Sequence, residues 1–496
     1  MGHQRTRTAP LTRGSALACR YPQGMSDWHR APLNELHASL CRGDIAVVDL
    51  VRHYLDRITQ HNSSINALVH VAGDYALEQA ERAQQSISAQ GTPPLTGIPS
   101  ADKDLVARAG MPTGYGSLTS KGLPVATASD PMALWLDQVG AISVGKTATS
   151  EFGMSASTES LATGETRNPH DLTRSAGGSS GGAAAAVAAG LVPFAPGSDG
   201  GGSIRIPALA CGLVGWKPSR GLIPAGSGWE SIAGLVVPGL ITRSVIDLAY
   251  VAEQLIQGDL HWSTQAPREA QTFSRAVESP ARGLTIGVTT AMPWPASWGV
   301  EPDAEAVRAL DIAQQALVDA GHSVRELPWQ PDQSYAENFL TVWAASAASV
   351  AVPAAREDSL EPLTRFLRER GQSTSAVDLA GAVAALRLFE RSTIEAFSGC
   401  DVVMTPGLNG PAPALGWLDP LDPERNFRQQ VELTPWTSFV NVAGLPALAV
   451  PVTYAHDLPL GVQLIGRPGG DGTLMGAAQQ LVEQLPEAQK WPQGFD

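Results

Sequence analysis

Apolar residues recur along this chain with two spacings that alternate with each other. Between residues 46 and 61 they fall every three or four positions, the spacing of an amphipathic helix. Short apolar runs at 141–144, 284–288 and 447–452 have the length of buried strands. Helices and strands follow one another over the whole chain, which predicts an α/β fold with a sheet between layers of helices.

The same patterns predict further elements. Helices are expected at 32–42, 75–88, 133–140 and 303–320, with three more inside 334–397 and a last one ending near 481. Strands are expected at 65–71, 322–327, 401–405 and 461–465, and loops at 166–171 and 258–282. The helices inside 334–397 show no chemical motif, so we expect them to shape a substrate pocket.

The stretch from Arg174 to Arg205 is unusual because no charged residue stands between Arg174 and Asp199. A membrane span needs about 20 predominantly apolar residues, whereas glycine, serine and alanine dominate this stretch and prolines interrupt it. A glycine-serine linker would be flexible, but this one runs directly into alanines. We therefore expect a buried helix over 182–189, flanked by Ser179 and Ser203.

Ser203 ends the run Gly200-Gly201-Gly202. Glycines let a backbone approach a substrate closely and turn several N–H groups toward one point, as an oxyanion hole requires. A serine at the end of such a run can attack the carbonyl whose oxygen those groups bind. The spacing alone leaves open whether Ser203 is a nucleophile or part of a flexible turn.

Two well-known motifs match the sequence residue by residue, but the segments around them are not the ones that these motifs require. Residues 140–147 fit the phosphate loop GxxxxGK[ST], yet the residues between the two glycines are typical of a strand. Residues 177–181 fit the GxSxG elbow of α/β hydrolases, which must follow a strand, whereas 166–171 are expected to be loop. The elbow also needs a later histidine, and His456 lies in a polar turn. Neither motif is taken as functional.

The composition and net charge indicate which classes of molecule the protein binds. Charged residues make up 17% of the 496 residues and hydrophobic residues 43%, which is typical of a compact globular chain. A net charge of −14 argues against nucleic acid or an anionic membrane as a partner, and favours a small molecule. No repeat or Pro-rich linker divides the chain. We expect one domain over 25–496, preceded by a disordered or misassigned extension over 1–24.

The cysteines show no metal-binding spacing. They are Cys19, Cys41, Cys211 and Cys400. The extension lacks the apolar run of a signal peptide. The chain is therefore expected to be a cytoplasmic protein with reduced thiols, without a metal or another cofactor.

Taken together, Lys103, Ser179 and Ser203 resemble the Ser-cisSer-Lys triad of the amidase signature family. Further motifs follow in the family's order, namely GIP and KD within 97–104, GAISVGKT, EFG, TRNPHD, GGSSGG, GSDGGGSIRIPA, CGLVGWKPSRG, LITRS, VNVAGLPALAVPV and GVQLIGRP. The resemblance covers about residues 30–485 and is weakest between 258 and 430. It implies a single α/β domain with a large mixed, twisted sheet covered by helices on both faces.

The resemblance also implies the roles of individual residues. Ser203 corresponds to the nucleophile, Lys103 to the base, and Ser179 to the serine with a cis peptide bond that relays protons. Ser179 is chosen over Ser180 because the family's cis serine stands 24 residues before the nucleophile. The oxyanion hole corresponds to the backbone N–H groups of Gly200, Gly201, Gly202 and Ser203.

A lysine base must be neutral near pH 7, about three units below its reference pKa, and burial can supply such a shift. Asp102 and Asp104 flank Lys103, and a carboxylate close to the ammonium would favour the charged lysine. In an extended strand alternate side chains point to opposite faces, so we expect both acids to point away from Lys103. The family usually has an apolar residue where Asp102 stands.

The implied activity is hydrolysis of a carboxylic amide through an acyl-enzyme, and anilides, carbamates and esters share its tetrahedral chemistry. The alternative is the glutamine-hydrolysing A subunit of a tRNA-dependent amidotransferase, although the sequence after PSRG is closer to stand-alone amidases. A monomer or homodimer is expected. Four aromatic residues are candidates for a substrate pocket or else plain core: Trp229, Trp343, Trp436 and Phe439.

Overall fold

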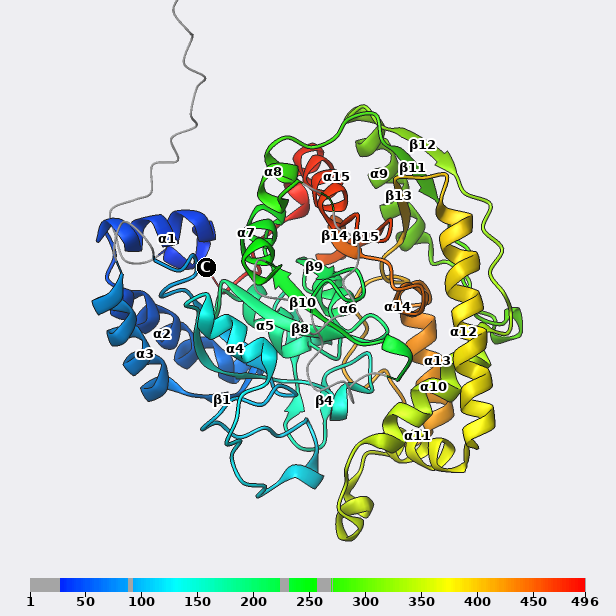
Figure 1. The fold of residues 1–496 in the computed structure, drawn as a ribbon, viewed down its shortest axis with the longest axis horizontal. Helices are drawn as coiled ribbons and strands as arrows, with labels where there is room; N and C mark the ends of the chain where they lie inside the picture. The colour runs from blue at the N-terminus through cyan, green and yellow to red at the C-terminus, as the bar shows by residue number, and fades with distance from the viewer. Residues whose placement is uncertain (1–26, 88–91, 224–231, 257–268, 270, 496) are drawn as a thin grey trace, which may run out of the picture.

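A computed structural model describes residues 27–87, 92–223, 232–256, 269 and 271–495 (Figure 1). The extension expected at 1–24 and the candidate pocket residue Trp229 lie outside the described residues. The α-helices are α1 (Leu33–Arg42), α2 (Val47–Ile65), α3 (Gly73–Ser86), α4 (Pro131–Gln138), α5 (Gly181–Ala188), α6 (Arg205–Ala210), α7 (Val245–Ile256), α8 (Phe273–Glu278), α9 (Ala304–Asp319), α10 (Tyr335–Ser349), α11 (Pro362–Ser373), α12 (Ala376–Phe397), α13 (Pro423–Leu433), α14 (Ser438–Val442) and α15 (Asp471–Gln484). The strands are β1 (Leu68–Val71), β2 (Pro99–Lys103), β3 (Ile142–Thr147), β4 (Glu159–Ser160), β5 (Gly164–Glu165), β6 (Arg167–Asn168), β7 (Asp171–Ser175), β8 (Phe194–Asp199), β9 (Val214–Lys217), β10 (Val237–Thr242), β11 (Thr285–Val288), β12 (Ser323–Glu326), β13 (Val402–Pro406), β14 (Ala447–Ala455) and β15 (Leu458–Gly466).

The larger sheet is mixed, with the strand order β12-β11-β13-β15-β14-β9-β10-β8. Strand β11 is parallel to both β12 and β13, and the remaining neighbours are antiparallel. The central strands β14 and β15 form a hairpin whose turn residues, His456 and Asp457, both have positive φ and are exposed. His456 is thus a turn residue, as its polar neighbours predicted.

Helices cover both faces of this sheet (Figure 1). On strand β9, a Cβ at Gly215 would lie 2.6 Å from the Ala208 side chain of α6. The next residue, Trp216, donates from Nε1 to Asp471 of α15 at 3.0 Å. Because adjacent strand residues point to opposite faces, α6 and α15 lie on opposite sides. Helix α5 packs beside α6, and α7, α8 and α9 pack with α15. The α/β fold with a large mixed sheet between helices is confirmed.

A three-stranded sheet, in the order β1-β3-β2, packs through β2 against β8, the edge strand of the larger sheet. All five residues of β2 are buried. The residues Gly145, Lys146 and Thr147 are the end of strand β3 itself. Residues 140–147 therefore do not form a phosphate-binding loop, as the sequence pattern predicted.

Helix α5 is buried along its whole length, as expected for the alanine-rich stretch. A Cβ at Gly182 would lie 2.2 Å from the backbone N of Ala148, so only glycine permits this close approach. Arg57 and Arg243 donate to the carbonyl oxygens at the end of the helix, which would otherwise lack partners. Within the described part of the chain, no helix has the length and apolar character needed to cross a membrane.

Three helices occur inside 334–397, as predicted, and they are α10, α11 and α12. Their aromatic side chains pack with those of neighbouring segments into a second apolar core. Its largest members are Trp294, Trp329, Tyr335, Phe339, Phe389, Phe397, Phe427, Trp436 and Phe439.

Two loops expected from the sequence contain regular structure. Segment 166–171 includes β6 and the start of β7, which form a short antiparallel hairpin, and the described part of 258–282 includes α8. Strands β6 and β7 have few apolar residues and therefore no clear periodicity. Helix α8 buries Phe273, Ala276 and Val277 at helical spacing, but it has only six residues, too few for a periodic pattern to stand out. A strand therefore does precede Ser179, contrary to the reason for rejecting the GxSxG elbow. That strand, β7, forms a two-stranded sheet with β6 and an isolated bridge from Arg174 to Ala414, and it is not one of the strands of the larger sheet.

Candidate active site

Lys103 is the last residue of β2, and its side chain is buried, with 1% of the residue exposed. Its Nζ lies 2.8 Å from Oγ of Ser179. It also lies 3.2 Å from Oγ and 3.4 Å from the carbonyl oxygen of Ser198, a neighbour that sequence reasoning missed. Burial lowers the pKa of Lys103 to about 7, although the Asp199 charge acts in the opposite direction. The lysine can therefore exchange a proton with Ser179 near neutral pH.

Ser179 lies just before helix α5, and the peptide bond between Gly178 and Ser179 is cis. The resemblance places the family's cis serine at this residue. Glycine is needed at 178 because a Cβ there would lie 2.7 Å from the carbonyl carbon of Ser157. Ser179 is 1% exposed. Its hydroxyl is therefore held in the interior beside the lysine.

Ser203 lies in the turn before α6 and borders a cavity. Its carbonyl oxygen accepts from the N–H of Ser180 at 3.1 Å, which joins the two serine segments. Within the described part of the chain, no hydrogen bond links its hydroxyl to Ser179 or Lys103. Such contacts are often long before substrate binds. The structure thus brings Lys103 and Ser179 into direct contact and connects Ser203 to them through the backbone.

The expected oxyanion hole needs one correction. The N–H of Gly202 donates to Oδ1 of Asp199 at 2.8 Å, so it cannot also point at a substrate oxygen. The N–H groups of Gly200, Gly201 and Ser203 donate to no other residue that the structure describes. Gly202 has a φ of 130°, and a Cβ there would lie 2.6 Å from Oγ1 of Thr437. Gly202 therefore shapes the turn, and three donors remain available.

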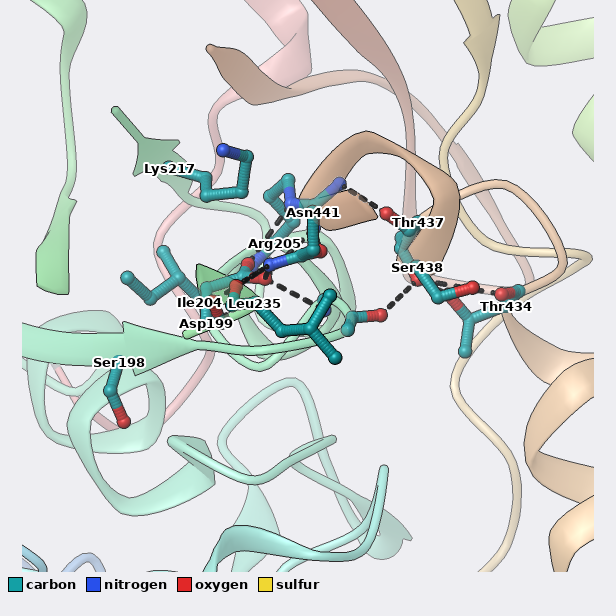
Figure 2. A network of polar contacts seen from close by, with 12 residues as sticks. Ser198, Asp199, Ile204, Arg205, Lys217, Leu235, Thr434, Thr437, Ser438 and Asn441 are labelled. Carbon is teal, nitrogen blue, oxygen red and sulfur yellow. Dashed lines mark hydrogen bonds and ion pairs between the residues drawn. The ribbon is translucent and has the colours of Figure 1, made fainter. Parts of the chain in front are cut away.

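A buried ion pair lies behind the glycine run (Figure 2). Nη2 of Arg205 is 2.8 Å from Oδ1 of Asp199, and neither side chain is exposed. Burial opposes ionisation of Asp199, but the Arg205 charge holds the pKa of that carboxyl below its usual range. The same carboxylate accepts from the N–H groups of Gly202 and Ile204. The pair thus fixes both ends of the turn that presents Ser203.

Arg205 also connects this turn to distant parts of the chain. It donates to Oδ1 of Asn441 at 2.6 Å, to the carbonyl oxygen of Thr437 at 2.9 Å and to the amide oxygen of Gln463. Figure 2 shows Arg205 lying between Asp199 and Asn441. A single sequence gives no signal for these contacts, because the partners stand more than 200 positions away.

Replacing Arg205 with methionine is expected to lower the free energy of unfolding by roughly 3 to 5 kcal/mol, because an unpaired charge would remain buried at Asp199. Arg308→Met is the matched control, since the ion pair of Arg308 with Glu305 is about 40% exposed and is worth about 1 kcal/mol at most. Urea denaturation followed by circular dichroism measures both losses. Equally small losses in the two variants would contradict the stabilising role of Arg205.

The two acids that flank Lys103 both bind other groups. Asp102 lies in strand β2, as expected, whereas Asp104 follows the end of the strand and lies in a turn. The Asp102 carboxylate accepts from Nε of Arg108 at 2.6 Å. The Asp104 carboxylate accepts from the N–H of Gly114 at 3.0 Å, and burial raises the pKa of Asp104 to about 6. Neither carboxylate forms a hydrogen bond or ion pair with the lysine.

The cavity beside Ser203 measures about 480 Å³, with the open solvent at its mouth included. Aromatic and aliphatic side chains dominate its wall, and no described residue of the wall is charged. The apolar members are Met154, Ala156, Ile206, Trp294, Phe339, Trp343, Phe427 and Val431.

Of the three aromatic candidates that the structure describes, Trp343 of α10 lies on this cavity. Trp436 and Phe439 are instead fully buried core residues, contrary to the pocket hypothesis. The Trp436 indole donates to a backbone carbonyl at 3.1 Å, and the Phe439 ring lies 4.7 Å from that of Trp329. Phe339 was missed, although it stands four residues before Trp343 and therefore on the same helix face.

Comparison with known proteins agrees with this geometry. A family model described as Amidase matches residues 49–475. Over 459 residues the chain is 37% identical to "Putative amidase AmiB2" of Mycobacterium bovis, covering 91% of this chain and 96% of that protein. It is 30% identical over 497 residues to the A subunit of the glutamyl-tRNA(Gln) amidotransferase of Thioalkalivibrio sulfidiphilus, covering 94% and 100%.

A similar solved structure is that of 6-aminohexanoate cyclic dimer hydrolase in complex with its substrate. It matches with a TM-score of 0.86 and 27% sequence identity, covering 95% of this chain and all of the other. The family match extends over most of the chain and includes the segments that carry Lys103, Ser179 and Ser203. The chain therefore belongs to the amidase signature family of amide C–N hydrolases.

Proposed function

We propose that this chain hydrolyses carboxylic amides with an uncharged, apolar acyl group through an acyl-enzyme on Ser203. The observation that supports this most is the hydrogen bond between buried Lys103 and buried Ser179, in a site where Ser203 borders an apolar cavity. Anilides, carbamates and esters with the same acyl group are further expected substrates, because they pass through the same tetrahedral intermediate.

In the proposed acylation step, Ser203 attacks the carbonyl carbon of the amide. Its proton passes to Ser179, whose own proton passes to neutral Lys103. The N–H groups of Gly200, Gly201 and Ser203 bind the oxyanion that forms. The proton returns by the same path to the amide nitrogen as the C–N bond breaks, and the amine leaves.

Deacylation repeats the path with water. The water attacks the ester carbon of the acyl-enzyme and transfers its proton through Ser179 to Lys103. As the intermediate collapses, that proton returns to the Ser203 oxygen and the carboxylic acid is released. Ser179 thus relays a proton in both half-reactions, and Lys103 stores it between the steps.

Apart from the proposed catalytic groups of Gly201 and Ser203, polar side chains on the cavity wall are paired within the protein, which supports an uncharged acyl group. Gln430 accepts from the N–H of Ala156 at 2.9 Å and donates to Asn426 at 2.7 Å. The Ser438 hydroxyl accepts from the Tyr335 hydroxyl at 2.8 Å. A charged substrate group buried here would lose its hydration without gaining a partner of opposite charge.

The second candidate is the glutamine-hydrolysing A subunit of a tRNA-dependent amidotransferase, favoured by the relative that carries that name. Glutamine has a carboxylate and an ammonium on its Cα, and neither would meet an opposite charge on the described cavity wall. This favours the stand-alone hydrolase. We propose that it acts on a small molecule as a monomer or homodimer, without nucleic acid, a membrane or partner subunits.

A panel of amides assayed with the purified protein alone tests the proposal. Anilides and simple amides of benzoic and hexanoic acid are expected to react with a kcat/KM at least about a hundredfold above that of glutamine, because the cavity offers no charge to the glutamine backbone. Ser203→Ala protein measures the background. Preferential hydrolysis of glutamine, or activity only with added partner subunits and ATP, would contradict the proposal.

A further inference from the structure

A buried acid lies on the face of β2 opposite the proposed base. Asp102 directly precedes Lys103 in the strand and is 1% exposed. Charges interact more strongly in the protein interior than in water, because the effective dielectric constant is lower. An uncompensated carboxylate at this position would stabilise the charged form of Lys103. A charged lysine cannot accept a proton from Ser179.

Arg108 meets this carboxylate at two points. Its Nε lies 2.6 Å from Oδ2 of Asp102 and its Nη2 lies 3.2 Å from Oδ1. Arg108 is itself 1% exposed, and its remaining nitrogen, Nη1, is 2.6 Å from Asp137. The hydroxyl of Ser143 donates to the same Asp102 carboxylate at 2.7 Å. The fork of the guanidinium matches the two carboxylate oxygens.

Stability alone does not account for this pair. Apolar side chains of similar volume in place of a buried ion pair are often neutral or stabilising. The pair also lies next to a lysine that the proposed mechanism requires in its neutral form. An electrostatic effect on that lysine is therefore the function that the position of the pair favours.

We infer that Arg108 is a positioning residue for the base: its pairing with Asp102 compensates the carboxylate charge beside Lys103 and leaves that lysine able to take up a proton. The inference rests on the proposed role of Lys103 in catalysis. Arg108 acts through Asp102 and touches neither the serines nor the cavity.

Other polar and charged residues lie around Lys103 or around the pair, and none of them is substituted in the test. From β8, Asp199 favours the charged lysine, and the hydroxyl of Ser198 is neutral. Asp104 follows Lys103 and binds the backbone of the next loop. On β3, Lys146 is the cross-strand partner of Asp102. The pKa of Lys146 responds to both Asp102 and Arg108, and Asp137 remains beside Arg108. Comparison of each single variant with the double variant therefore reports on the Asp102–Arg108 pair.

The experiment compares Arg108→Met, Asp102→Asn and the double variant Asp102→Asn/Arg108→Met with the unaltered protein. The probe is an amide without ionisable groups, and kcat/KM is measured between about pH 5.5 and 9.5. Arg108→Met leaves a negative charge near the base. The acid limb of the pH profile, where kcat/KM falls as the pH is lowered, should therefore move up by about one pH unit. This is a tenfold loss of kcat/KM on that limb. Asp102→Asn removes the carboxylate beside Lys103 and leaves Arg108 paired with Asp137 alone, so it should move the limb down.

The double variant distinguishes electrostatics from packing. With both charges gone, its acid limb should return to within about 0.3 units of the unaltered protein, even if the plateau activity is lower. A uniform loss of activity at all pH values, with the limb unmoved in Arg108→Met and Asp102→Asn, would overturn the inference. If Arg108→Met does not fold, Asp102→Asn still tests the inference: an acid limb that stays in place overturns it, because the Asp102 charge would then have no effect on Lys103.

Failure of the proposed function gives a different result. If Lys103 is not the base, Lys103→Ala retains the acid limb of the unaltered protein. The other case is that Lys103 is the base but Arg108 has no electrostatic effect on it. Lys103→Ala then loses the acid limb, whereas the Arg108 and Asp102 variants keep that limb in place. The two outcomes therefore separate the inference from the mechanism on which it rests.

Discussion

Ser203→Ala is expected to reduce kcat for amide hydrolysis by about a million-fold, the loss seen when a serine hydrolase loses its nucleophile. No acyl-enzyme can form without the hydroxyl, and the three oxyanion donors alone supply only residual catalysis. The Ser203 hydroxyl has no hydrogen-bond partner in the described part of the chain. The fold should therefore be unaffected, with the free energy of unfolding within about 0.5 kcal/mol of the unaltered protein.

Ser179→Ala is the matched comparison in the same steady-state assay. It should keep measurable activity, because the nucleophile, the base and the oxyanion donors all remain and a water molecule can take the place of the relay hydroxyl. A Ser203→Ala protein as active as the unaltered one, or a greater loss from Ser179→Ala, would show that the two serines have been assigned the wrong roles.

Lys103→Ala is expected to lower kcat by about 10³- to 10⁴-fold, at the upper end of what general base catalysis contributes. The pH dependence of the activity also tests whether Lys103 is the base. The base works only when neutral, and burial lowers the pKa of Lys103 to about 7. Activity should therefore rise with pH and level off above about pH 7, with about tenfold less activity per unit below it. Lys103→Ala should lose this acid limb.

Lys217→Met is the matched control for that prediction. Burial also lowers the pKa of Lys217 to about 7, but its Nζ donates to the carbonyl oxygen of Pro218 at 2.8 Å and touches neither serine. The acid limb should stay in place in this variant, whatever happens to stability. Loss of the limb in Lys217→Met and its survival in Lys103→Ala would refute the assignment of the base.

The sequence carried enough information to select the residues that we propose for the site. Glycine runs, a buried alanine helix and a lysine at a strand end are local patterns, and together they resemble one family closely enough to single out Lys103, Ser179 and Ser203. Strand geometry alone predicted that Asp102 points away from Lys103. Asp104 lies in the turn after the strand, and its contact with Gly114 depends on the following loop. The placement of Lys103 against Ser179 agrees with these local signals.

What the sequence could not supply depends on contacts between distant segments. The N–H of Gly202 is not available to a substrate oxygen because it donates to Asp199. The orientation of the Asp199 carboxylate depends on Arg205 and Asn441. The cavity wall combines α10 and α13 with the loop around Met154. Aromatic residues suit both a pocket and a core, so composition could not distinguish Trp343 from Trp436.

The most direct test of the central claim is to find the atom that carries the acyl group. The protein would be mixed with an excess of an aromatic ester, quenched in acid within one turnover and cleaved after Arg174 and Arg205. The resulting peptide, 175–205, contains five serines, at positions 175, 179, 180, 198 and 203, so fragment-ion mass spectrometry must assign the site. We predict acylation of Ser203 alone and an unmodified peptide from Ser203→Ala. Acylation of Ser179 or Ser180, or turnover without any acylated serine, would contradict the mechanism.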